Sequence, residues 1–136
     1  MWGETLTPGR VGSPGRGKPR AYTDLVALDR FLVWAPVLVW AGVIFLLSSV
    51  PDLGTGLGMW DLIGRKIAHA LEFGLLGALL FRALSAVRLA IAIGSLYAVT
   101  DEVHQSFVEG RVGSPFDWAI DTVGVVAGVV VLARRR

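Results

Sequence analysis

Four apolar runs, separated by short polar segments, divide most of the chain. The first, Phe31–Val50, has 20 residues and no charge. As a helix it would be about 30 Å long, which matches the hydrocarbon core of a membrane. The other three carry a few ionisable residues each and cover about 62–81, 89–107 and 115–133. The pattern predicts an all-α membrane protein, a four-transmembrane-helix bundle over residues 31–133.

The connections between the runs have the composition of loops. Glycine-containing segments at 51–64 and 108–114 and a basic turn at 82–88 separate the four predicted helices. The first 25 residues hold Gly, Pro, Ser and Arg with almost no large apolar residues. Such a segment buries too little surface to offset its ordering entropy, so we expect residues 1–25 to form a disordered cytoplasmic tail. No apolar run follows its first charges, so we do not expect it to act as a secretory signal peptide.

The overall composition also favours a membrane protein. Apolar residues make up 54% of the chain and charged residues 18%, with a mean hydropathy of +0.61. Soluble domains average about 45–50% apolar and about 25% charged residues. The last three runs are each a weak membrane signal alone, so a soluble helical bundle is the alternative. The chain has no Cys, which excludes disulfides and thiolate metal sites.

The basic residues lie where a membrane topology would place them. If both termini are cytoplasmic, ten of the thirteen Lys and Arg residues lie on the cytoplasmic side, and Arg65, Lys66 and Arg111 lie outside. This distribution satisfies the positive-inside rule and decides against the soluble bundle. It also explains the sequence pI near 9.5 without a nucleic-acid partner.

Ionisable residues of the last three runs fall at one end of the predicted bundle, towards the outside. A charge at membrane depth costs about 2.5–3.5 kcal/mol on insertion scales, so such residues are rare and usually functional. Helical spacing places His69 beside Glu72 and Asp101 beside both His104 and Gln105, while Glu102 points to the adjoining face. We therefore expect a paired, hydrogen-bonded polar network at this end.

The fourth run carries a stripe of acidic and small residues, spaced for one helix face: Asp117, Asp121, Gly124 and Gly128. The glycine pair permits close helix packing. Ser114-Pro-Phe-Asp117 also resembles a capping box with Pro at the first helical position, so Asp117 is either a helix cap, a site residue or both. For Lys66 the alternative is contact with lipid headgroups, and for His104 an interfacial position.

The spacing of residues along the chain does not match known metal-binding or phosphate-binding motifs. Oxygen and nitrogen ligands for a divalent metal are present in principle: His69, Glu72, Asp101, His104 and Asp117. No spacing matches a metal motif such as H-E-x-x-H, and no Gly-rich phosphate loop occurs. We therefore expect no metal and no cofactor. Buried polar residues near the surface still fit a lipid headgroup or an anionic envelope precursor, with Lys66 and Arg111 as charge partners.

Several segments together resemble the VanZ family of small bacterial membrane proteins. The shared pieces span roughly Val43–Gly128: LLSSVP at Leu46–Pro51, Lys66-x-x-His69-x-x-Glu72, DEVHQSFVEGR at Asp101–Arg111, Ser114-x-x-Asp117, and Gly124. This chain has Arg65, Phe73, Glu109 and Asp121 where the family often has an acidic residue, Tyr, Pro and Asn. The resemblance implies a four-helix protein of the bacterial plasma membrane. Its named member is associated with resistance to the glycopeptide teicoplanin.

Residues and resemblance together give one site hypothesis with two functional alternatives. Glu72 and Asp101 are the candidate catalytic residues of an enzyme acting on a lipid or glycan precursor. The candidate binding residues are Lys66, His69, Glu102, Gln105, Arg111, Asp117 and Asp121, and Arg111 is expected to pair with Asp101 or Asp117. The expected partners are membrane lipids and a lipid-linked envelope precursor or glycopeptide; a homo-oligomer is left open.

The alternative is a non-enzymatic accessory protein whose polar cluster holds the helices together or clamps a ligand. A proton-coupled transporter ranks third, because four helices without repeats leave little room for alternating access unless the protein oligomerises.

Overall fold

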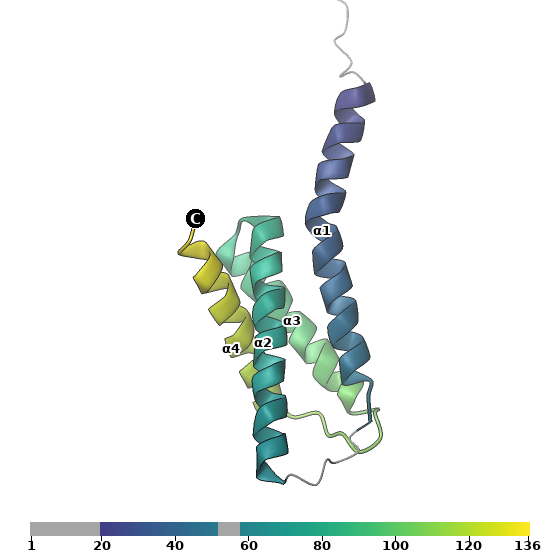
Figure 1. Cartoon of the computed structure of the whole chain (residues 1–136), viewed down its shortest axis with the longest axis vertical. Helices are drawn as coiled ribbons and strands as arrows, with labels where there is room; N and C mark the ends of the chain where they lie inside the picture. Colours follow the sequence, from purple (N-terminus) through teal and green to yellow (C-terminus); the bar gives the residue numbers. More distant parts are fainter. Residues whose placement is uncertain (1–19, 52–57) are drawn as a thin grey trace, which may run out of the picture.

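A computed structural model describes residues 20–51 and 58–136 of the chain as four α-helices (Figure 1). Their bounds are α1 Arg20–Ser48, α2 Met59–Leu84, α3 Val87–Gln105 and α4 Pro115–Ala133. The described residues contain no strand, which confirms the all-α prediction. The end of α1, the start of α2, the end of α3 and the start of α4 lie together at the lower end in Figure 1.

The helix bounds follow the apolar runs closely, except at the start of α1. Helix α4 has the predicted bounds, and α2 and α3 each begin two or three residues earlier than predicted. Helix α1 begins at Arg20, so the prediction that residues 20–25 belong to a disordered tail is wrong. Ala, Leu and Arg favour helix, and a helix is free to continue beyond the apolar part that a membrane requires. The rest of the predicted tail, residues 1–19, and loop residues 52–57 lie outside the described residues.

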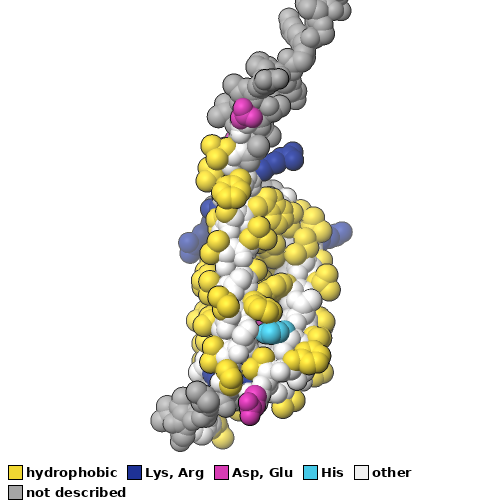
Figure 2. Space-filling model, turned by 90° about the vertical axis from the view of Figure 1, so that its right-hand side faces the viewer, with side chains coloured by type: hydrophobic (Ala, Val, Ile, Leu, Met, Phe, Trp, Pro, Cys, Tyr) yellow, Lys and Arg dark blue, Asp and Glu magenta, His cyan; other side chains and the backbone are white. Residues whose placement is uncertain are grey.

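Three of the four helices are long and apolar enough to cross a membrane. These segments are Leu28–Ser48, Leu62–Leu84 and Pro115–Ala133. Helix α3 has 19 residues but carries Arg88, Asp101 and Glu102, which lower its apolar content. Many large apolar side chains point outward, as lipid-facing positions would, and they cover much of the flank seen in Figure 2.

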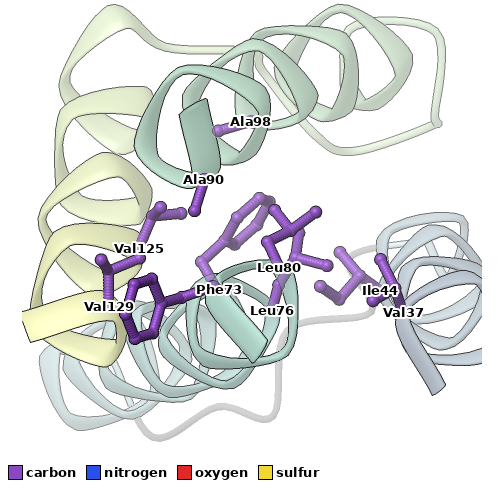
Figure 3. Packing of buried hydrophobic residues seen from close by; sticks show 10 residues of the cluster. Val37, Ile44, Phe73, Leu76, Leu80, Ala90, Ala98, Val125 and Val129 are labelled. Atoms are coloured by element: carbon purple, nitrogen blue, oxygen red, sulfur yellow. The ribbon is translucent and has the colours of Figure 1, made fainter. Parts of the chain in front are cut away.

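A small apolar core joins the helices (Figure 3). Helix α2 contributes its largest fully buried side chains, Phe73 and Leu76, and α4 contributes Val125 and Val129. Ile44 of α1 is also fully buried. Helices α2 and α4 therefore form the centre, with α1 and α3 packed against them.

Close backbone contact adds to side-chain packing between α2 and α4. A Cβ atom on Gly128 would collide with the carbonyl group and Cα of Gly74, and one on Gly124 would collide with the backbone of Ala70. A Cβ atom on Gly77 would meet the backbone of Val125. The glycine stripe predicted to permit close packing does so, because only glycine lets the two backbones approach this closely.

Helix α1 is attached to the bundle by hydrogen bonds from ring groups to backbone carbonyls. The Trp40 indole Nε1 donates to the carbonyl oxygen of Glu72 at 2.9 Å. The Tyr97 hydroxyl donates to the carbonyl oxygen of Ala41 at 2.6 Å. These bonds connect α1 to α2 and α3 and fix the rotation of its lower half, which places the end of α1 beside the polar side chains.

Candidate functional site

A cavity of about 480 Å³ lies where α1 ends and α2 and α4 begin. Eight of the nine predicted site residues line it: Lys66, His69, Glu72, Glu102, Gln105, Arg111, Asp117 and Asp121. Apolar side chains complete the wall: Leu47, Val50, Leu62, Val112 and Ile120, with Arg65 as a third cation. The structure thus gathers residues from all four helices and from the loop before α4.

Lys66, two turns into α2, forms an ion pair with Asp117 in the first turn of α4. Both side chains are about one-third exposed, at 30% and 34%. The Lys66 ammonium also lies 5.3 Å from the centre of the Phe116 ring, within reach of a cation–π contact. Lys66 therefore belongs to the cavity wall and bridges two helices.

Helix α4 is capped by Ser114, and a residue of α3 supplies the second bond of the cap. The Ser114 hydroxyl accepts from the backbone N–H of Phe116 at 3.2 Å. The backbone N–H of Ser114 donates to Glu102 Oε2 at 2.7 Å. In a capping box the side chain of Asp117 would accept from the backbone N–H of Ser114. Glu102 accepts this hydrogen bond instead, and Asp117 pairs with Lys66.

Asp101 lies behind the cavity wall and is held by two donors. The Ser48 hydroxyl donates to Asp101 Oδ2 at 2.9 Å, and the Gln105 amide donates to the same oxygen at 2.7 Å. Only 2% of Asp101 is exposed, and it does not line the cavity. Of the two neighbours predicted for Asp101, Gln105 is confirmed, whereas His104 contacts Ser49 and Phe45 instead. The predicted catalytic role of Asp101 stays a prediction.

His69 and Asp121 meet between α2 and α4. His69 Nδ1 lies 3.4 Å from Asp121 Oδ1, which is longer than a normal N–H···O hydrogen bond. Asp121 is 1% exposed, and neither of its carboxylate oxygens has a hydrogen-bond donor in the described part of the chain. Buried acidic oxygens without a donor also occur on Glu72, Asp101 and Glu102.

Arg111 holds the end of α1 rather than a carboxylate. Its Nε donates to the carbonyl oxygen of Val50 at 3.0 Å, and its Nη2 donates to that of Leu47 at 3.4 Å. The Nη1 donates to Gln105 Oε1 at 3.4 Å. The prediction that Arg111 pairs with Asp101 or Asp117 is therefore wrong. Carbonyl groups at and just after the end of a helix lack the usual i+4 donor, so they are available to a nearby guanidinium.

His104 attaches α1 to α3 and does not line the cavity. Its ring stacks on Phe45 with centroids 4.2 Å apart, and its Nε2 lies 2.9 Å from the Ser49 hydroxyl. Ser48 and Ser49 were not predicted as site residues. The sequence feature that could have indicated them is a pair of adjacent hydroxyl side chains at the polar end of an otherwise apolar run.

The segments that carried the family resemblance therefore meet at one place in the fold. The end of α1, the end of α3 and the loop before α4 are connected by Ser48, His104 and Arg111. A family model described as VanZ/LLP1 matches residues 26–135. Among curated proteins and among solved structures, no match to the chain was found. The chain belongs to the VanZ/LLP1 family.

Proposed function

We propose that this VanZ-like protein spans the bacterial plasma membrane four times, with both termini in the cytoplasm. In this proposal α3 is the fourth span, and its polar end is sheltered by contact with α1 and α4. The C-terminal arginines, Arg134–Arg136, follow the far end of α4 from Asp117, and Arg134 lies about 26 Å away at 1.5 Å per residue. The positive-inside rule then directs the cavity towards the outer leaflet.

The cavity, in this proposal, binds the phosphate-bearing headgroup of a lipid-linked component of the cell envelope. The observation that carries the proposal is the presence of three cationic side chains, Arg65, Lys66 and Arg111, in a cavity of about 480 Å³ whose wall also holds apolar side chains and four carboxylates. Guanidinium and ammonium groups are strong donors to phosphate oxygens. Apolar side chains beside them suit the first part of a lipid chain.

Donor capacity supports this assignment. Arg111 has five N–H groups, and in the described part of the chain three of them point to Val50, Leu47 and Gln105. One N–H on each terminal nitrogen remains for a ligand. Lys66 has three N–H groups and directs one of them to Asp117. Both cations are therefore held in place by protein partners and keep further donors.

Binding is favoured over catalysis because only one of the two candidate acid–base residues reaches the cavity. Glu72 lines the wall, whereas Asp101 is enclosed by Ser48 and Gln105. The association of the family with teicoplanin resistance fits a protein that binds an envelope precursor. We therefore infer that the protein binds the precursor without modifying it. Teicoplanin resistance of the cell would then report on this binding.

Native mass spectrometry of the protein in detergent micelles tests the proposal. We expect undecaprenyl phosphate to bind with higher affinity than phosphatidylglycerol or inorganic phosphate. We expect Lys66→Gln and Arg111→Gln to weaken its binding at least tenfold. Arg82→Gln is the matched control, because it removes one positive charge at the opposite end of α2. Equal binding of undecaprenyl phosphate by all four proteins would refute the proposal.

A further inference from the structure

We propose that His69, Asp101 and Asp121 form a binding site for one divalent transition-metal ion, of the Zn²⁺ or Mn²⁺ type. The three residues come from α2, α3 and α4, and each offers one ligand atom within 4.8 Å of the other two. The site lies deeper in the bundle than the three cations of the cavity. The inference rests on these side chains and stands apart from the proposed lipid ligand.

The spacing of the ligand atoms is close to what one metal ion requires. Zn²⁺ binds imidazole nitrogen and carboxylate oxygen at about 2.0–2.2 Å in tetrahedral geometry, so two of its ligand atoms are about 3.4 Å apart. His69 Nδ1 and Asp121 Oδ1 have this separation, at 3.4 Å. All three ligand atoms lie within 4.8 Å of one another, so side-chain rotations that move the Asp101 oxygen by about 1 Å would bring the three onto one ion.

Unpartnered buried oxygens provide the second observation. Asp101 is 2% exposed and Asp121 is 1% exposed, yet Asp101 Oδ1 and both oxygens of Asp121 lack a hydrogen-bond donor in the described residues. An unpaired carboxylate removed from water is costly. Two of the nearby cations are engaged elsewhere, Lys66 with Asp117 and Arg111 with main-chain carbonyls and Gln105. A divalent cation would satisfy one oxygen of Asp101 and one of Asp121 together.

The surroundings of Asp101 orient it as a ligand. Ser48 and Gln105 both donate to Oδ2, which leaves Oδ1 as the oxygen available to a metal. Hydrogen bonds to a ligating carboxylate are the usual support of a metal ligand. His69 and Asp121 also line the cavity, so an ion here would remain accessible to a bound molecule.

The donor set decides the class of metal. One imidazole and two carboxylates favour Zn²⁺ or Mn²⁺ over Cu⁺, which prefers sulfur, and the chain has no Cys. Glu72 also lines the cavity and has an unpartnered buried oxygen, Oε2, so it is the candidate for an additional ligand.

The test measures bound metal directly on untagged full-length protein in detergent micelles. The protein is stripped with a chelator, loaded with Zn²⁺ or Mn²⁺, dialysed and analysed by inductively coupled plasma mass spectrometry. We expect about one ion per wild-type chain and less than one-tenth of that in Asp121→Asn. Asp29→Asn is the matched control, because Asp29 is exposed near the other end of α1, and it should retain the ion.

Two results would overturn the proposal. One is a wild-type protein that retains no more metal than Asp121→Asn. The other is an equal loss of metal in Asp29→Asn, which would indicate adventitious binding. If Asp121→Asn does not fold, the wild-type protein alone decides: it must retain about one ion, and its thermal unfolding midpoint must rise on loading. Lys66→Gln is expected to retain the metal ion while it loses lipid binding. This result would show that the metal site and the lipid site are independent.

Discussion

Replacing Gly128 by Ala tests the contact that positions the whole site. A Cβ atom at this position would overlap the carbonyl oxygen, carbonyl carbon and Cα of Gly74. All three atoms are backbone, so no side-chain rotation relieves the collision, and α4 must move away from α2. The displacement would also separate His69 from Asp121, which lie on these two helices.

The magnitude follows from two opposing effects. Overpacking a close interface costs typically about 1–3 kcal/mol, and the upper end applies here because the colliding atoms are rigid. Replacing Gly by Ala in a helix stabilises it by about 0.5–1 kcal/mol. Gly42→Ala measures this second effect alone, because a Cβ atom on Gly42 has nothing within 4 Å in the described structure. We expect the two variants to differ by about 3 kcal/mol in free energy of unfolding.

Reversible unfolding in mixed micelles provides the assay. The protein is titrated with sodium dodecyl sulfate, and the loss of helix is followed by far-UV circular dichroism for the wild type and both variants. Gly128→Ala should unfold at a lower detergent fraction than wild type, and Gly42→Ala at the same or a higher one. If the two variants unfold together, α2 and α4 do not touch through their backbones and the site cannot be arranged as described.

Three further predictions address the site, the attachment of α1 and the topology. Glu72→Gln should leave undecaprenyl phosphate binding within about threefold of wild type if the cavity only binds; loss of function with intact folding and binding would point to acid–base work. Ser48→Ala should reduce the free energy of unfolding by about 1–3 kcal/mol, because it removes a donor from the buried Asp101 carboxylate; an unchanged value would contradict this account. In a chain without native Cys, Glu109→Cys should react with a membrane-impermeant thiol reagent in intact cells, and Arg135→Cys should not; the reverse labelling would invert the topology.

The helices could be predicted because each apolar run is bounded by glycine, proline or charge. Pro115 after Ser114 marks the start of α4, and the structure places it there. The beginning of α1 could not be predicted in the same way. Hydropathy indicates the length that suits a membrane, whereas helix formation depends on backbone hydrogen bonds, which continue to Arg20.

The gathering of the site was predictable, but its pairing was not. One shared end of the bundle and the helical period sufficed to bring eight residues to one cavity. The pairing depends on the rotation of each helix and on backbone groups that a sequence does not display. Glu102, for example, accepts from a loop N–H, and Arg111 donates to carbonyl groups of α1. His69 and Asp101 were named as possible metal ligands, but Asp121 was not, and the three were not grouped. These residues come from three helices, so no spacing along one segment reveals the group.

The contact between Arg111 and α1 has a consequence for how sequences of this kind can vary. Arg111 donates to the carbonyl oxygens of Leu47 and Val50, which every amino acid provides, so the contact is independent of the side chains there. Those same side chains line the cavity. Positions 47 and 50 can therefore change the size and shape of the apolar wall while the attachment of α1 is retained. Ligand preference and architecture are separable at this point, and a library confined to these two positions would alter the first without disturbing the second.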